Sequence, residues 1–156
     1  MRTAIGSIAC VLVAAATASP QEPATATLLA STWTGHSLCV DKARHPACKD
    51  ETIVYRFVPA GPHATTLYAD KILDGKRVPM GALEMHLGAG DRSASAHFTW
   101  GTTTGTWAYT MTSDTTLRGT LHVEPGDALV RNVDARRVAD KDVPAAPPLA
   151  EYGTPH

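Results

Sequence analysis

Residues Gly105 to Val123 read GTWAYTMTSDTTLRGTLHV, and this stretch decides the fold class of the chain. Large or apolar residues alternate with small or polar ones on both sides of a short polar break. These alternating residues are Trp107, Tyr109 and Met111 before the break, and Leu117, Gly119, Leu121 and Val123 after it. A period of two predicts a β-hairpin with one buried face. Pairing the apolar faces places Tyr109 opposite Gly119, where the ring covers bare backbone. The same register pairs Met111 with Leu117 and Trp107 with Leu121.

Six further segments have the composition or the alternation of β-strands. They span residues 31–39, 51–58, 65–72, 77–87, 93–100 and 129–138. Short turn sequences separate them, and Asp74-Gly75 is the strongest hairpin signal among these turns. Outside the first residues, no window shows the 3.6-residue period of a helix. We therefore predict an all-β fold, an antiparallel up-and-down eight-stranded β-barrel, with a two-sheet sandwich as the alternative.

One hairpin of this barrel has an uncertain register. Pro79 and Gly81 predict a bulge or an unpaired edge near the start of the segment 77–87, because proline has no N–H to donate to a neighbouring strand. Without a bulge, the Asp74-Gly75 turn would place Leu83 opposite Thr66. The register of this pair of strands therefore stays open.

The two ends of the chain differ in composition from the strands between them. Arg2, a run of small apolar residues and an Ala-x-Ala sequence at 16–18 predict a secretory signal peptide over residues 1–18. The apolar run is shorter than the ~20 residues that a membrane-spanning helix needs. We expect residues 19–27 to form a flexible arm, 28–138 the barrel domain and 139–156 a disordered Pro-rich tail. The processed protein is then secreted or periplasmic, without a membrane span.

Export leaves two cysteines, Cys39 and Cys48, which are expected to form a disulfide in an oxidising compartment. A redox pair is a weaker alternative, because the spacing is C-x8-C rather than C-x-x-C. A zinc site that adds His36 and His45 is another, although thiolates in an exported protein usually oxidise.

Charge and motifs exclude several function classes. Removing Arg2 from the 14 basic residues leaves 13 against 15 acidic ones, a net charge of −2. This balance gives no reason to expect nucleic acid or an anionic membrane as a partner. The sequence contains no nucleophile elbow, P-loop, dinucleotide-binding, HExxH or EF-hand motif. We therefore expect no catalytic residue, no cofactor and no metal site, and an enzyme is the least favoured class.

Trp33 lies early in the first predicted strand, and in this the sequence resembles the lipocalin and avidin superfamily, the calycin-like barrels. In that superfamily a G-x-W motif closes one end of the barrel. This sequence departs from the G-x-W motif, because Ser31 stands in place of the glycine and a glycine follows at Gly35. The stretch ADKILDGKRVPMGAL (residues 69–83), together with the GTW hairpin, is similar to small exported bacterial β-barrel proteins of unassigned function. The resemblance spans residues 28–138. It implies a lipocalin-like barrel and a binding role, and it carries over no catalytic residue.

Aromatic residues are the candidate ligand-binding groups. In a lipocalin-like barrel they would point inward and line a pocket; the candidates are Trp33, Tyr55, Tyr68, Trp100, Trp107 and Tyr109. Small residues on the same phase would leave volume for a ligand: Ala94, Ala96 and Gly119. The alternative is that the rings fill the core, because protein interiors pack close to crystal density.

Two functions are favoured by these sequence features. The first is a binding module for a small apolar or aromatic ligand, with residues 41–50 as a lid. The second is a surface-binding or protease-inhibitor-like envelope protein that inserts residues 19–26 into an enzyme's cleft. The expected partner is thus a small molecule or an envelope protein.

Overall fold

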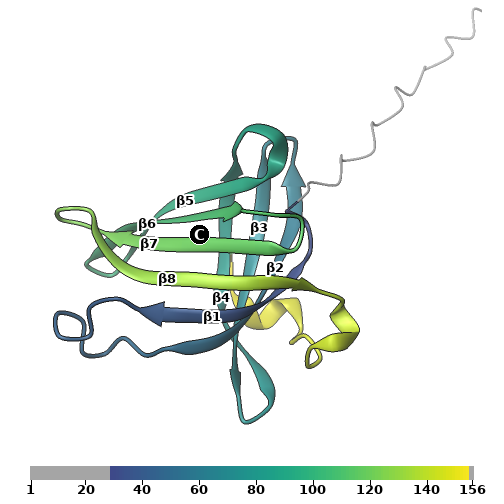
Figure 1. Ribbon diagram of the computed structural model, residues 1–156, viewed down its shortest axis with the longest axis horizontal. Helices are drawn as coiled ribbons and strands as arrows, with labels where there is room; N and C mark the ends of the chain where they lie inside the picture. Colours follow the sequence, from purple (N-terminus) through teal and green to yellow (C-terminus); the bar gives the residue numbers. More distant parts are fainter. Residues whose placement is uncertain (1–28, 155–156) are drawn as a thin grey trace, which may run out of the picture.

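Eight β-strands form a closed barrel in the computed structural model, which describes residues 29–154. In chain order the strands are β1 (Thr32–Cys39), β2 (Glu51–Gly61), β3 (Ala64–Leu73), β4 (Lys76–Leu87), β5 (Ser93–Trp100), β6 (Thr103–Met111), β7 (Thr116–Val123) and β8 (Ala128–Val138). Each strand pairs antiparallel with the next, and β8 returns to pair with β1 (Figure 1). The predicted up-and-down eight-stranded barrel is confirmed. The predicted signal peptide (1–18) and arm (19–27) lie outside the described residues.

The β6–β7 hairpin has the register that the alternation predicts. Tyr109 pairs with Gly119, flanked by the pairs Met111–Leu117 and Trp107–Leu121. The backbone of Gly119 lies directly beneath the Tyr109 ring, so that a Cβ there would be 2.5 Å from two ring carbons. Glycine is therefore required at this position by close approach of the ring.

A bulge sets the register of the β3–β4 hairpin. The pairing shifts between Ala69, which faces Gly81, and Asp70, which faces Pro79. Leu83 consequently pairs with Leu67 rather than with Thr66. The bulge predicted from Pro79 and Gly81 is confirmed, and it brings the apolar residues of the two strands onto one face.

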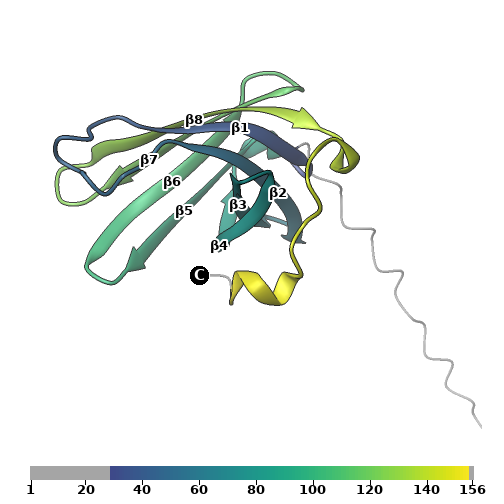
Figure 2. The same ribbon diagram turned by 90° about the horizontal axis from the view of Figure 1, so that it is seen from below.

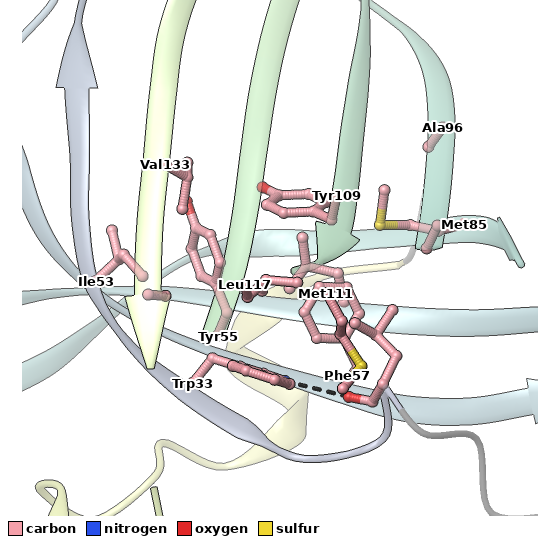
Figure 3. Packing of buried hydrophobic residues seen from close by; sticks show 14 residues of the cluster. Trp33, Ile53, Tyr55, Phe57, Met85, Ala96, Tyr109, Met111, Leu117 and Val133 are labelled. Atoms are coloured by element: carbon pink, nitrogen blue, oxygen red, sulfur yellow. Dashed lines mark hydrogen bonds between the residues drawn. The ribbon is translucent and has the colours of Figure 1, made fainter. Parts of the chain in front are cut away.

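A cluster of buried side chains forms the core of the barrel (Figure 3). Near the start of β1, the Trp33 indole N–H donates to the Leu29 carbonyl at 3.2 Å, and the Arg137 guanidinium lies 5.0 Å from the centre of the Trp33 ring. Trp33 and Leu29 are both fully buried. We call this the Trp33 end of the barrel; the disulfide end, opposite, contains the end of β1 at Cys39 and the turn between β5 and β6.

The seam between β4 and β5 is the weakest joint in the wall. These two strands share two residue pairs, His86 with Ser95 and Leu87 with Ala94, whereas every other neighbouring pair of strands shares at least six. Both pairs lie next to the short connection through the 3-10 helix η1 (Ala89–Asp91). Beyond them, β4 and β5 take different directions (Figures 1 and 2). β4 and β5 are therefore paired only next to η1, and the seam between them is splayed along the rest of its length.

The prediction of a disordered tail from residue 139 was wrong for the described part of that segment. Two 3-10 helices follow β8, η2 (Asp140–Asp142) and η3 (Leu149–Tyr152). Tyr152 is only 5% exposed and its hydroxyl donates to Asp70 at 3.0 Å. The tail is ordered by this contact with β3, 82 residues away in sequence, which its Pro-rich composition could not reveal. None of the helices within residues 29–154 is long and apolar enough to cross a membrane.

Candidate functional site

The six predicted ligand-binding rings fall into three environments. Trp33, Tyr55 and Tyr109 are buried in the core. Trp107 packs against that core and is only partly buried. The remaining two rings, Trp100 and Tyr68, are not inside the barrel. The structure therefore brings four of the six together.

Trp100 and Tyr68 depart from the inward position expected of them, each for its own reason. Trp100 is on the same strand face as the buried Ala94 and Ala96, but it is 81% exposed because β5 runs past the enclosed part of the barrel. Tyr68 belongs to the opposite face of β3 from Leu67, which is in the core. Its ring lies on the outer wall, where it packs edge-on against Tyr152 at 5.1 Å between centroids.

A stack of aromatic rings forms one inner wall of the barrel. The Trp107 and Tyr109 rings are stacked at 5.6 Å with an interplanar angle of 10°. Tyr55 and Phe57 meet the Tyr109 ring edge-on at 5.7 and 5.5 Å. We call Trp107, Tyr109, Tyr55 and Phe57 the aromatic wall. Because each ring is held by its neighbours, the wall is a preformed surface rather than a set of mobile side chains.

Partly exposed apolar side chains border the aromatic wall. Besides Trp107, the partly buried residues packed against the core are Ala69, Met80, Leu83 and Leu87, all on β3 or β4. Met80 and Leu83 come from the part of β4 that does not pair with β5. Solvent therefore reaches inner-face apolar surface on the side where the wall is splayed.

A polar cluster lies inside the barrel at the disulfide end. The Arg131 guanidinium donates to Ser37 Oγ at 2.8 Å, to Glu51 Oε2 at 3.2 Å and to the Lys49 carbonyl at 3.0 Å. We call Arg131, Glu51 and Ser37 the arginine cluster. Reasoning from the sequence missed it, although Arg131 shares the strand phase of the buried Val133, and a charged residue on an apolar phase is the signal that would have found it.

Tyr55 and Tyr109 place two hydroxyls close to this cluster. In Figure 3 both hydroxyl oxygens are on the side of their rings that faces Val133. Burial raises the pKa of Tyr55 to about 12, while hydrogen bonding with Tyr109 and the charge of Arg131 act in the opposite direction. Burial also raises the pKa of Tyr109 well above its ordinary value, and Tyr55 adds to the rise. Both phenols are therefore neutral hydrogen-bonding groups at any physiological pH.

The predicted disulfide is present and positions the loop next to the arginine cluster. Cys39 and Cys48 are bonded with a Cα–Cα distance of 6.0 Å. Asp50 accepts the Cys39 N–H at 2.9 Å and the Lys42 ammonium at 2.6 Å, and these bonds, that of Lys42 first, lower the pKa of the Asp50 carboxyl. The loop in turn presents the Lys49 carbonyl to Arg131. Residues 41–50 thus contact the arginine cluster through the Lys49 carbonyl.

Two grooves lie on the outer wall. The first, of about 460 Å³, is lined by Thr34, Gly35, His36, Thr52, Thr116, Asp134, Ala135 and Arg136. The second, of about 390 Å³, runs beside the start of β1 and the end of β8. Within residues 29–154 no group of three or more His, Cys, Asp or Glu side chains could hold a metal ion.

Comparison with known proteins gives the fold alone. No protein-family model matches the chain, and no curated protein does. Among solved structures, a redesigned β-barrel, b11L5F_LGL, aligns with a TM-score of 0.52 and 16% identity over 75% of this chain and 97% of its own. EF1p2_mFAP2b bound to DFHBI aligns with a TM-score of 0.48 and 14% identity over 70% of this chain and 93% of its own. At 16% identity, the similarity to the redesigned barrel supports the architecture alone, and any function must be argued from the residues of the site.

Proposed function

We propose that this protein is an exported, lipocalin-like binding module that takes a small apolar or aromatic ligand against the partly exposed Trp107 of the aromatic wall. The observation that carries the proposal is the pair Trp107 and Trp100. They lie on the inner phase of adjacent strands, one partly buried and the other 81% exposed. Trp107 lies opposite Ala96, four residues along β5 from Trp100, and the partly buried Met80 and Leu83 add apolar surface from β4. Contiguous apolar patches that reach solvent mark ligand-binding grooves.

The chemistry of the site suggests a flat ligand with a polar edge. A ring laid on Trp107 would extend the existing Trp107–Tyr109 stack, since offset stacking contributes about 0.5–1.5 kcal/mol beyond burial. The arginine cluster supplies a guanidinium that can donate to an oxygen acceptor. Export is supported by the Cys39–Cys48 disulfide, because such bonds persist mainly in oxidising compartments.

Fluorescence titration with 1-anilinonaphthalene-8-sulfonate tests the proposal. The unaltered protein is expected to bind the probe saturably, and Trp107→Ala should weaken binding by at least about fivefold, the equivalent of one lost stacking contact. Leu38→Ala is the matched control, because Leu38 is an apolar residue on β1 near the disulfide end, 48% exposed and on the outer phase. Equal loss of affinity in both variants, or no saturable binding by the unaltered protein, would reject the inner site.

A further inference from the structure

We propose that residues 139–154, the C-terminal latch, hold β4 in position beside β5 by docking Tyr152 on the outer wall, and so control access to the aromatic wall. This inference rests on the ligand site proposed above for its functional part. Its mechanical part, the dependence of β4 on Tyr152, is argued from the contacts of Tyr152 with Asp70 and Tyr68 of β3 and from the Arg77–Asp70 ion pair that joins β3 to β4.

The anchor of the latch is a buried ion pair between β3 and β4. Arg77 donates through Nε and Nη2 to Asp70 Oδ2 at 2.8 and 2.5 Å, and the Tyr152 hydroxyl donates to the same oxygen at 3.0 Å. Asp70 is fully buried. The Tyr152 ring packs edge-on against Tyr68, and the Arg56 guanidinium lies 5.2 Å from the centre of the Tyr68 ring. One residue of the latch therefore completes a hydrogen-bonded cluster that joins two strands.

The rest of the latch is loosely held. Tyr152 is the one buried side chain among residues 139–154, and Leu149 in the same 3-10 helix is 56% exposed. At its start, the latch is fixed by a hydrogen bond from Thr32 of β1 to Asp140. Between these two attachments the chain contains three prolines, at 144, 147 and 148, which cannot donate backbone hydrogen bonds. The latch is thus attached at two places, at Asp140 near its start and at Tyr152 near its end, and the second attachment depends on one side chain.

The strand beside this ring, β4, is one of the two strands that meet at the least paired seam of the barrel. β4 is paired along its length with β3, but with β5 only through His86 and Leu87. Both ribbon views show η3 lying beside β4 (Figures 1 and 2). Elements with few lateral hydrogen bonds open at low free energy. Release of Tyr152 is therefore expected to let β4, with Met80 and Leu83, move away from β5 and widen the splayed seam.

Hydrogen exchange of the full chain, read by peptide mass, tests the mechanical part. Tyr152→Ala is expected to raise exchange in β4 by about tenfold or more and to leave β7 unchanged, because local opening sets these rates. Tyr152→Phe, which retains the ring and loses the hydroxyl, should show a smaller rise in β4. Leu149→Ala is the matched control from the same 3-10 helix and should behave as the unaltered protein.

Two outcomes of that experiment would overturn the proposal: exchange in β4 unchanged by Tyr152→Ala, or raised equally in β4 and β7, which would mean general destabilisation. If Tyr152→Ala does not fold, the contrast between β4 and β7 in Tyr152→Phe decides.

The functional part is tested by stopped-flow binding of 1-anilinonaphthalene-8-sulfonate. The association and dissociation rates should both increase at least about threefold in Tyr152→Ala, because gating motions limit entry and exit alike. Faster exchange in β4 with unchanged probe rates would overturn the control of access. Absence of probe binding by the unaltered protein would instead reject the proposed function, and the exchange experiment would still decide whether Tyr152 holds β4.

Discussion

Replacing Gly119 by alanine tests whether the aromatic wall sets the stability of the barrel. A Cβ at this position would lie 2.5 Å from Cδ1 and Cε1 of Tyr109 and 3.2 Å from Cβ of Val133. Carbon atoms prefer separations of about 3.5–4.0 Å, so the ring must shift by roughly 1 Å. That ring is stacked on Trp107 and held edge-on by Tyr55. We expect unfolding free energy to fall by about 1–3 kcal/mol, the usual cost of overpacking a core.

Thermal and urea unfolding followed by circular dichroism measure this loss, which corresponds to a fall in Tm of roughly 3–15 °C for a domain of this size. Tyr109→Leu supplies the mechanistic control: Gly119→Ala should cost less in that background, because the clashing ring is gone. Thr120→Val, one position along on the outer face, should change stability by less than about 0.5 kcal/mol. Full stability of Gly119→Ala, or additive effects of the two core changes, would refute the reasoning.

Three further predictions concern the disulfide, the buried ion pair and the buried phenols. Replacing Cys39 and Cys48 by serine should cost about 2.5–3 kcal/mol in urea unfolding, because a loop of about ten residues is released in the unfolded chain; an unchanged midpoint contradicts this. Arg77→Leu should destabilise by about 3–5 kcal/mol, since Asp70 would be left charged and buried, and Asp70→Asn in the same chain should recover part of the loss. The folded pKa of Tyr55 is raised to about 12 from its ordinary value of 10.0, so its contribution to stability is complete below pH 10 and is lost as pH rises toward 12. Urea midpoints between pH 9 and pH 12 should therefore fall less steeply in Tyr55→Phe, and parallel profiles would count against a buried phenol.

The sequence was sufficient for the parts of the fold that local alternation encodes. The Tyr109–Gly119 pairing follows from two short strands with a period of two and a polar break, and the bulge follows from the chemistry of Pro79. Both depend on residues close together in the chain. The phase of Arg131 was equally visible, and a charged residue on this apolar phase of β8 indicates a guanidinium inside the barrel.

What could not be predicted depends on contacts between distant segments. The docking of Tyr152 on Asp70 joins residues 82 positions apart, and a Pro-rich segment with one aromatic residue has no local pattern that foretells it. Trp100 follows the inward phase of β5, yet it is exposed because the enclosed part of the barrel ends before it. Strand phase is local, whereas the extent of enclosure depends on how far β4 and β5 remain paired.

The splayed seam also bears on how the folded protein behaves at high concentration. A barrel exposes no strand edge where each strand is hydrogen-bonded to both of its neighbours. β4 and β5 share only two residue pairs, so most of their facing edges lack this protection. Unsatisfied strand edges recruit other chains and seed aggregates. Pro79, which has no N–H to offer a neighbour, and the bulge next to it make β4 a poor template for such recruitment. The irregularities in the part of β4 that does not pair with β5 thus help to keep one molecule from joining its sheet to the next.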